Sequence, residues 1–324
     1  MDYQNVILTI IAVIAFIGNM LTVLLFLRKS KLLKKTYNCL ILALAIQDVL
    51  LAICIMVLPG FILGGDYYNV PADSEISRWI YCKMLWSHFI PFALGIASVY
   101  TCLMLTFDRW LAVVKPLSYK KYEQSRMVVI LTVLFPWIAG MCFEITAPLG
   151  TSSTEINGTV VCYWKTREYT SKTIFLAVFT FLGMIVIPAA LMVLAYTSII
   201  VHMKRSQNRV TVIRNNSEMR RRRSAFMSLK RVTMTAFFAS TVVIVCWLPD
   251  QFFYALSQVQ LTELQTTTHF VVKILAFANS CFNPVIYCFS NSTYTRGLRE
   301  MFGCLCCKMY PLVSEFSMPE HTTS

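Results

Sequence analysis

Polar and charged residues occur inside long apolar stretches of this 324-residue chain, where lipid tails would surround them. Asp48 and Arg109 carry charge, and Asn19, Ser98 and Asn283 add polar groups. A carboxylate or a guanidinium in hydrocarbon is costly unless it is paired or hydrated, so such residues usually mark function. The pattern therefore predicts a polar channel through a bundle of helices, which is typical of a conformational switch.

The histidines do not form a metal-binding or catalytic motif. His88, His202, His269 and His321 are scattered along the chain, and their spacing matches no zinc site. A membrane enzyme would need such a cluster, so we predict that the chain is not an enzyme and has no enzymatic cofactor. A seven-span transporter is a distant alternative, but transporters tend to contain repeated halves and this sequence shows no internal repeat.

Seven apolar segments must position these polar residues. They cover residues 6–27, 39–63, 79–113, 127–148, 173–202, 232–258 and 268–289. Each is long enough to cross about 30 Å of hydrocarbon as a helix, which takes about 20 residues. Of all residues, 57% are hydrophobic and only 14% are charged, too few charges to cover a soluble domain. The sequence therefore predicts an all-α membrane protein built as a seven-transmembrane helix bundle.

The net charge of +13 is distributed unevenly between the two sides of this bundle. Lysine and arginine concentrate in the first, third and fifth connections, whereas the opposite connections hold several acids. By the positive-inside rule the N-terminus lies outside and the C-terminus inside, so the basic runs indicate topology beside anionic lipid rather than nucleic-acid binding. We expect an extracellular N-terminus at 1–5, a membrane domain at 6–290, a short amphipathic eighth helix at 291–303 and a cytoplasmic tail at 304–324.

Cysteines and a glycosylation motif fit this topology. Cys82 and Cys162 both lie on the outer, oxidising side, so we expect a disulfide between them, with two free thiols as the alternative. Asn157 begins an Asn-Gly-Thr glycosylation motif in the same outer loop. Three cysteines that follow the amphipathic stretch are predicted palmitoylation sites that hold it on the membrane: Cys304, Cys306 and Cys307.

Short motifs occur in a fixed order on these segments. They are Gly18-Asn19, Leu44-Ala45-Ile46-Gln47-Asp48, Asp108-Arg109-Trp110, Cys246-Trp247-Leu248-Pro249 and Asn283-Pro284-Val285-Ile286-Tyr287. Each motif alone is weak evidence, but all of them in order and on the expected sides form a strong signal. The chain resembles rhodopsin-like (class A) G-protein-coupled receptors from residue 6 to about residue 302. The resemblance implies a multi-pass protein of the plasma membrane that binds an extracellular agonist and activates a heterotrimeric G protein.

The resemblance also implies an allosteric sodium ion at the middle of the membrane. The expected polar network consists of Asp48, Ser98, Asn279, Ser280 and Asn283, with Asp48 and Ser98 as sodium ligands. Oxygen donors around one carboxylate suit a hard cation. A dry hydrogen-bonded network and a protonated Asp48 are the alternatives.

A second implied group of residues forms the activation switch. Its members are Asp108, Arg109, Tyr196, Trp247, Pro249, Pro284 and Tyr287. Proline removes a helix hydrogen bond and kinks the helix, so Pro249 and Pro284 are expected hinges for an outward swing of the sixth helix. Arg109 is expected to pair with Asp108 at rest and to be freed toward the G protein on activation. Arrestin and a receptor kinase are further expected partners.

Three residues depart from the family pattern in this region. Trp110 replaces the usual tyrosine, which is a tolerated change. Leu229 stands where many relatives carry an acid that locks Arg109, which leads to the hypothesis that the chain signals measurably without agonist; no signal above mock-transfected cells would contradict it. Val243 replaces a phenylalanine one turn before Trp247, so the usual contact there is smaller.

The ligand pocket is expected between the outer halves of the third, fifth, sixth and seventh helices. Its predicted residues are His88, Pro91, Phe92, Tyr163, Trp164, Asp250, Gln251, Tyr254, Lys273 and Phe277. Pro91 replaces the aspartate of aminergic receptors, and Phe277 replaces the lysine of opsins, so neither a monoamine nor retinal is expected.

Two interpretations of the pocket charges remain open. Asp250 and Lys273 either form a salt bridge or contact opposite ends of a zwitterionic or peptide ligand, and Glu144 is either a second acid or a protonated core residue. The Cys-Trp-Leu-Pro-Asp-Gln run and the hairpin-like loop at 159–163 are similar to neuropeptide receptors. A neuropeptide is therefore the expected agonist, with a non-amine small molecule or a lipid-derived agonist as the alternative.

Overall fold

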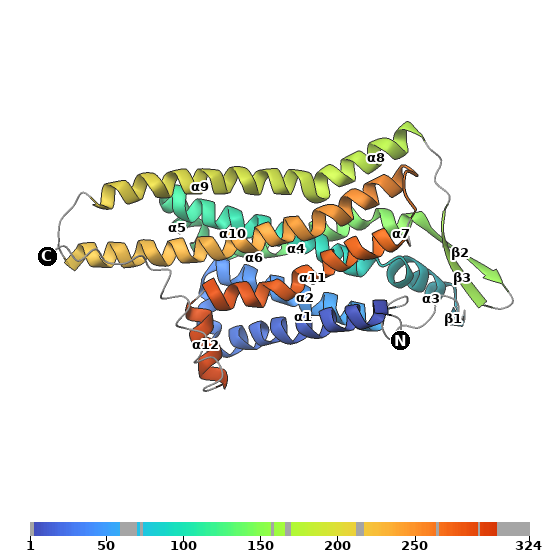
Figure 1. Cartoon of the computed structure of the whole chain (residues 1–324), viewed down its shortest axis with the longest axis horizontal. Coiled ribbons are helices and arrows are strands. Elements are labelled where there is room, and N and C mark those ends of the chain that lie inside the picture. The colour runs from blue at the N-terminus through green and yellow to red at the C-terminus, as the bar shows by residue number, and fades with distance from the viewer. Residues whose placement is uncertain are drawn as a thin grey trace.

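The computed structural model describes residues 3–58, 70–71, 74–156, 159–165, 170–211, 217–263, 266–290 and 292–302. Seven helical spans are long and apolar enough to cross a membrane, and they lie side by side along the long axis of the molecule (Figure 1). They contain α1 (Tyr3–Arg28), α2 (Thr36–Val57), α4 (Phe89–Val114), α6 (Arg126–Glu144), α8 and α9 (Ser171–Phe181 and Ile187–Thr211), α10 (Ser217–Gln258) and α11 (Thr267–Ser290). The predicted seven-helix bundle is confirmed.

Short helical elements connect these spans or follow them. They are η1 (Ser30–Lys34), α5 (Pro116–Gln124), α7 (Thr146–Gly150), the π-helical turn η3 (Leu182–Val186) between α8 and α9, and α12 (Ser292–Phe302). α5 begins at Pro116, whose fixed φ angle suits the first position of a helix. α12 buries Tyr294 and Leu298 and exposes Glu300, so it is amphipathic. Its position on the membrane surface stays a prediction.

The third predicted segment, 79–113, is not one continuous helix. α3 (Glu75–Ile80) runs into the π-helical turn η2 (Tyr81–Trp86), and α4 begins only at Phe89. His88 between them adopts a left-handed conformation with φ of 56°. The physical reason is Pro91, which has no N–H for the carbonyl of Ser87 and whose ring would clash with that carbonyl.

A small antiparallel sheet covers one end of the bundle. β2 (Thr151–Ile156) and β3 (Thr159–Trp164) form the expected hairpin, and β1 (Val70–Pro71) pairs with the other side of β3. A disulfide joins Cys162 of β3 to Cys82 of η2, whose Cα atoms are 5.5 Å apart. The hairpin is therefore fixed to the start of the third span.

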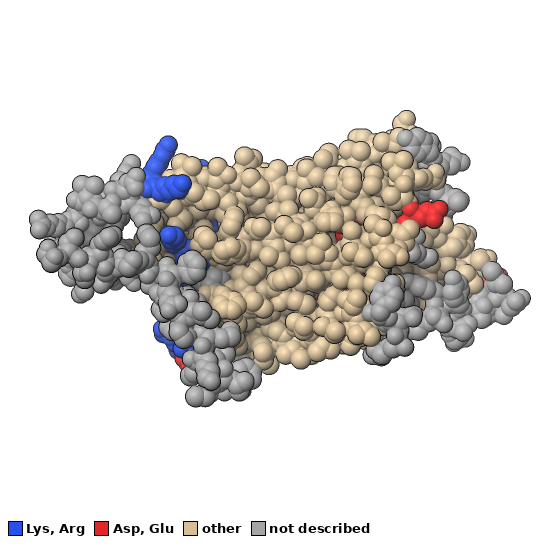
Figure 2. All heavy atoms as spheres, viewed as in Figure 1, with Lys and Arg blue, Asp and Glu red and all other residues tan. Residues whose placement is uncertain are grey.

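The bundle is apolar around its girth and charged at its ends. Figure 2 shows lysine and arginine at the end where α9 and α10 extend, an acidic side chain at the sheet end, and uncharged residues between them. Large apolar side chains of α6 face outward, for example Leu131, which is 58% exposed. The largest buried side chains inside are Trp247, Tyr287 and Phe277. An apolar girdle of this kind matches a lipid environment.

Some predicted sites lie outside the described residues. These are the glycosylation site Asn157, the palmitoylation sites Cys304, Cys306 and Cys307, and the tail at 304–324.

Candidate functional site

A cavity of about 420 Å³ opens at the sheet end of the bundle. Side chains of α1, α4, α6, α10 and α11 line it, together with Trp86 of η2 and Trp164 of β3. Seven of the predicted pocket residues line it: His88, Phe92, Trp164, Asp250, Gln251, Tyr254 and Lys273. Ligand pockets usually enclose about 300–1,000 Å³, so this cavity has the size of a binding site.

Three predicted pocket residues do not line this cavity. Tyr163 is 44% exposed because successive strand residues point to opposite faces, and its neighbours Cys162 and Trp164 point inward. Pro91 is buried in the first turn of α4. Phe277 is fully buried and packs against Phe92 with ring centroids 5.8 Å apart, so it lies behind the cavity wall.

One side of the cavity is acidic. Asp250 and Gln251 on α10 are each 2% exposed, and Glu144 on α6 is 3% exposed. Gln251 donates from its amide to Asp250 over 3.3 Å, and Lys273 on α11 interacts electrostatically with Asp250. Asp250 and Lys273 therefore lie close to each other, as predicted, and Glu144 lines the same cavity.

The sheet and its disulfide hold aromatic side chains at the cavity mouth. The rings of Trp86 and Trp164 lie 5.5 Å apart at centroids, directly beside the disulfide of Cys82 and Cys162. Lys83 donates to the carbonyl of Thr151 over 2.5 Å, which fastens η2 to β2. Burial lowers the pKa of Lys83, and the nearby Lys165 lowers it further.

Trp247 connects the cavity wall to the interior of the bundle. Its ring meets Phe92, a cavity residue, edge-on at 6.4 Å, and no part of Trp247 is exposed. Its six-membered ring fits against Gly95 of α4, where a Cβ atom would lie only 1.9 Å from the ring. Glycine at 95 therefore permits this close approach. Neither Gly95 nor its role was predicted from the sequence.

Asp48 of α2 is the centre of a buried polar network that joins α2 to α11. Its two carboxylate oxygens accept hydrogen bonds from Ser280 at 2.8 Å and from Asn283 at 2.7 Å. Ser98 instead donates to the carbonyl of Leu94 over 3.1 Å. Ser98 was predicted as a sodium ligand together with Asp48, and this role stays a prediction.

Several oxygens of the polar network lack a donor within the described part of the chain. They are the buried side-chain carbonyl oxygens of Asn19, Asn279 and Asn283. A set of neutral oxygens with one carboxylate matches the ligands that a hard cation prefers. The residues present therefore fit the sodium ion that the resemblance implies.

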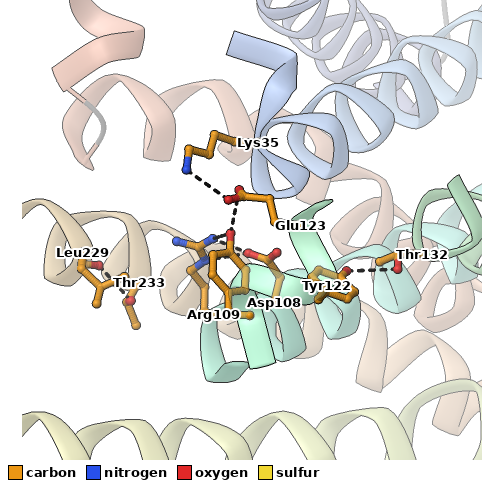
Figure 3. A network of polar contacts seen from close by, with 9 residues as sticks. Lys35, Asp108, Arg109, Tyr122, Glu123, Thr132, Leu229 and Thr233 are labelled. Carbon is orange, nitrogen blue, oxygen red and sulfur yellow. Dashed lines mark hydrogen bonds and ion pairs between the residues drawn. The ribbon is translucent and has the colours of Figure 1, made fainter. Parts of the chain in front are cut away.

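Arg109 is buried at the opposite end of α4 from the cavity. Its Nε donates to Asp108 over 2.9 Å, and a second hydrogen bond from the same guanidinium reaches the same carboxylate oxygen. Figure 3 also shows Leu229 and Thr233 of α10, where the Thr233 hydroxyl donates a hydrogen bond to the backbone carbonyl of Leu229. Arg109 is thus paired with Asp108, as expected at rest, and Leu229 offers it no carboxylate from α10.

Tyr119 of α5 holds Arg109 from the other side. The Arg109 guanidinium donates to the Tyr119 hydroxyl over 3.1 Å, and that hydroxyl donates to Glu123 over 3.2 Å. Lys35 forms an ion pair with Glu123 at 3.2 Å, which extends the chain of contacts to the start of α2 (Figure 3). Tyr119 and Glu123 were not predicted as site residues, although their i, i+4 spacing on a short helix between two spans is visible in the sequence.

Two further residues of the predicted switch, Tyr196 and Tyr287, are buried inside the bundle. The Tyr196 hydroxyl lies 3.2 Å from the Thr106 hydroxyl and 3.3 Å from that of Ser240, so α9, α4 and α10 meet at one polar contact. The Tyr287 hydroxyl is buried and has no hydrogen-bond partner among the described residues. Neither tyrosine is bonded to Arg109 in the contacts described.

Comparisons with known proteins agree with this arrangement. The family model described as 7 transmembrane receptor (rhodopsin family) matches residues 18–287. Somatostatin receptor type 4 of Rattus norvegicus is 25% identical over 92% of this chain and 72% of its own length. Galanin receptor 2a of Danio rerio is 24% identical over 93% of this chain and 78% of its own length. Allatostatin-A receptor of Bombyx mori is 29% identical over 91% of this chain and 78% of its own length.

The family match covers most of the bundle, and the relatives align along nearly the whole chain. The relatives named here are receptors, not enzymes. The protein spans the plasma membrane several times and belongs to the rhodopsin family of seven-transmembrane receptors.

Proposed function

We propose that the chain is a receptor for an extracellular peptide and that it activates a heterotrimeric G protein. One observation carries the proposal: a ligand-sized cavity at one end of α4 and a restrained Arg109 at the other end are connected by buried polar and aromatic residues. A ligand that favours one arrangement of this connection shifts the equilibrium at the far end by its differential affinity.

Peptide is the proposed ligand class for two reasons. The relatives carry the names of somatostatin, galanin and allatostatin-A receptors. The cavity also carries both signs of charge and aromatic walls, which suit the backbone ends and side chains of a short peptide. A purely apolar lipid-derived agonist would bring no polar group to the carboxyl groups of Asp250 and Glu144 that line the cavity.

Movement of α10 is the proposed step between ligand and G protein. Pro249 lies inside α10, directly before the cavity residue Asp250 and two residues after Trp247. Its missing N–H leaves a weak point in the helix, so contacts made by a ligand with Asp250 and Gln251 bend α10 there. The far end of α10 then moves outward and opens a crevice at Arg109 for the G protein. Arrestin and a receptor kinase are proposed to act at the same end.

Sodium is proposed as an allosteric ligand of the resting receptor. Asp48 with the neutral oxygens of Asn279 and Asn283 would hold it, and Ser98 lies on the helix that faces them. The ion would supply a positive charge that balances the buried carboxylate. Ser280 and Asn283 orient that carboxylate by donating one hydrogen bond to each of its oxygens.

The test measures G-protein activation in cells that express the intact chain or the Arg109→Ala variant at equal surface levels. Cells are exposed to a library of short peptides, with mock-transfected cells as the control. We expect some peptides to evoke a signal from the intact chain and none from the variant.

Two outcomes would contradict parts of this proposal. Signal evoked only by small molecules or lipids would replace the peptide with the alternative agonist class. Peptide-evoked signal that survives in Arg109→Ala would show that the crevice at Arg109 is not the G-protein site.

A further inference from the structure

The acidic side of the cavity contains two carboxyl groups from different helices. Asp250 belongs to α10 and Glu144 to α6, and both line the cavity while remaining almost fully buried, at 2% and 3% exposure. They are close enough to interact electrostatically. Two like charges in one buried site repel each other unless a cation or a donor stands between them.

Hydrogen-bond acceptors exceed donors around Asp250. One of its carboxylate oxygens accepts the hydrogen bond from Gln251, but the other oxygen is buried and accepts none from the described residues. The amide oxygen of Gln251 is also buried without a donor in that part of the chain. Two acceptors in one wall fit a ligand group that carries several N–H donors.

The net charge of the cavity lining also favours a cationic ligand group. With both acids ionised, Asp250 and Glu144 contribute −2 and Lys273 contributes +1, so the described lining sums to −1. Lys273 interacts electrostatically with Asp250, which accounts for one of the two acids. The ring of His269 stacks on that of Phe253 with centroids 5.2 Å apart, and His88 occupies the N-cap position of α4. A ligand cation would balance the remaining carboxylate.

Aromatic side chains complete the wall opposite the acids. Trp86, Trp164, Phe92 and Phe270 line the cavity. The faces of such rings attract a guanidinium or an ammonium group. Acidic acceptors on one side and aromatic faces on the other form a recognisable setting for an organic cation.

We infer that the pocket recognises its ligand through a cationic group, a guanidinium or an ammonium, that binds beside Asp250 and Glu144. For a peptide this group is an arginine or lysine side chain. The inference rests on the proposed peptide function, which it makes more specific. It goes beyond a salt bridge between Asp250 and Lys273, because that bridge leaves Glu144 and the two unpaired acceptors unexplained.

The test uses two matched pools of tetrapeptides that are acetylated at the N-terminus and amidated at the C-terminus, so that no terminal charge remains. In one pool arginine is fixed at each position in turn, and in the other citrulline, which has the same shape without the charge, takes its place. The purified full-length protein in lipid nanodiscs is heated with each pool, and its melting temperature reports binding whether or not a G protein responds.

Variants locate the binding group. Asp250→Asn and Glu144→Gln each remove one negative charge at nearly constant size, and Glu155→Gln removes an exposed acid that pairs with Arg78 at the surface. We expect arginine pools to raise the melting temperature and citrulline pools not to. We also expect apparent affinity to fall by about 10–100-fold in Asp250→Asn or Glu144→Gln, and to stay unchanged in Glu155→Gln.

Three results would overturn the inference that the pocket recognises a cationic group. Equal stabilisation by arginine and citrulline pools, stabilisation by neither, or unchanged affinity in both pocket variants would overturn it. If one pocket variant fails to fold, the other one and the citrulline comparison still decide. Binding of arginine pools without any G-protein signal would uphold this inference while contradicting the proposed function, so the two failures are distinguishable.

Discussion

We propose that the Tyr119 hydroxyl, which accepts a hydrogen bond from Arg109, restrains Arg109 in the resting receptor. The proposed role predicts that Tyr119→Phe raises signalling in the absence of agonist. The substitution removes only the hydroxyl, which accepts from Arg109 at 3.1 Å and donates to Glu123 at 3.2 Å. Burial raises the pKa of Tyr119 above its ordinary value, and the Asp108 carboxylate adds to this, so the hydroxyl stays protonated and keeps donating to Glu123.

The magnitude follows from the contacts that are lost. A hydrogen bond to a charged group contributes about 1.5–3 kcal/mol. Tyr119 and Glu123 are only partly buried, so we take the lower end, about 1.5 kcal/mol. Since every 1.4 kcal/mol changes an equilibrium about tenfold, the active fraction should rise by up to about tenfold. Arg109 keeps its pairing with Asp108, which limits the effect.

The assay compares agonist-free G-protein activation at equal surface expression. Tyr122→Phe is the matched control, because Tyr122 lies on the same helix but hydrogen-bonds to Thr132, away from Arg109 (Figure 3). We expect a clear rise for Tyr119→Phe and little change for Tyr122→Phe. Equal basal signals from the two variants would refute the reasoning that Tyr119 restrains the resting state.

Three further predictions concern the interior and the mouth of the bundle. Gly95→Ala places a methyl group against Trp247 and should lower the free energy of unfolding by about 1–3 kcal/mol, which a lower melting temperature would report. An unchanged melting temperature would mean that the Trp247 ring moves aside freely. Asp48→Asn should abolish the extra thermal stability that sodium chloride gives over N-methylglucamine chloride, whereas equal sodium effects in both proteins would exclude a site there. Cys162→Ser removes the disulfide to Cys82, which closes a loop of 80 residues and stabilises the fold by roughly 4–5 kcal/mol. Agonist-evoked signal and melting temperature should therefore both fall, and retention of both would show that the disulfide is dispensable.

Apolar length was sufficient to predict the bundle, because lipid forces each span to satisfy its backbone as a helix. The start of the third span was predicted less well. Pro91 is visible in the sequence, but a left-handed His88 and a π-helical turn before it depend on how the disulfide and β3 hold η2. The short strand β1 was also missed, since two residues carry no periodic pattern.

Motif residues and packing residues differ in how well a sequence reveals them. Asp48 and Arg109 stand out because charge in an apolar span is rare. Gly95 does not stand out, because its role is a close approach to Trp247 on another helix. Tyr119 meets Arg109 across a helix boundary, a contact that no helical spacing predicts. Seven predicted pocket residues line the cavity, but Tyr163 does not, because the strand pairing that orients it was unknown.

The most direct test of the account asks whether the two ends of the receptor are coupled. Binding of an active peptide pool to the purified protein is measured with and without nucleotide-free G protein, in the intact chain and in Arg109→Ala. Coupling between sites is reciprocal and typically changes affinity by about 5–150-fold, so G protein should tighten peptide binding by this order in the intact chain only. Identical peptide affinity with and without G protein in the intact chain would contradict the proposed connection between the cavity and Arg109.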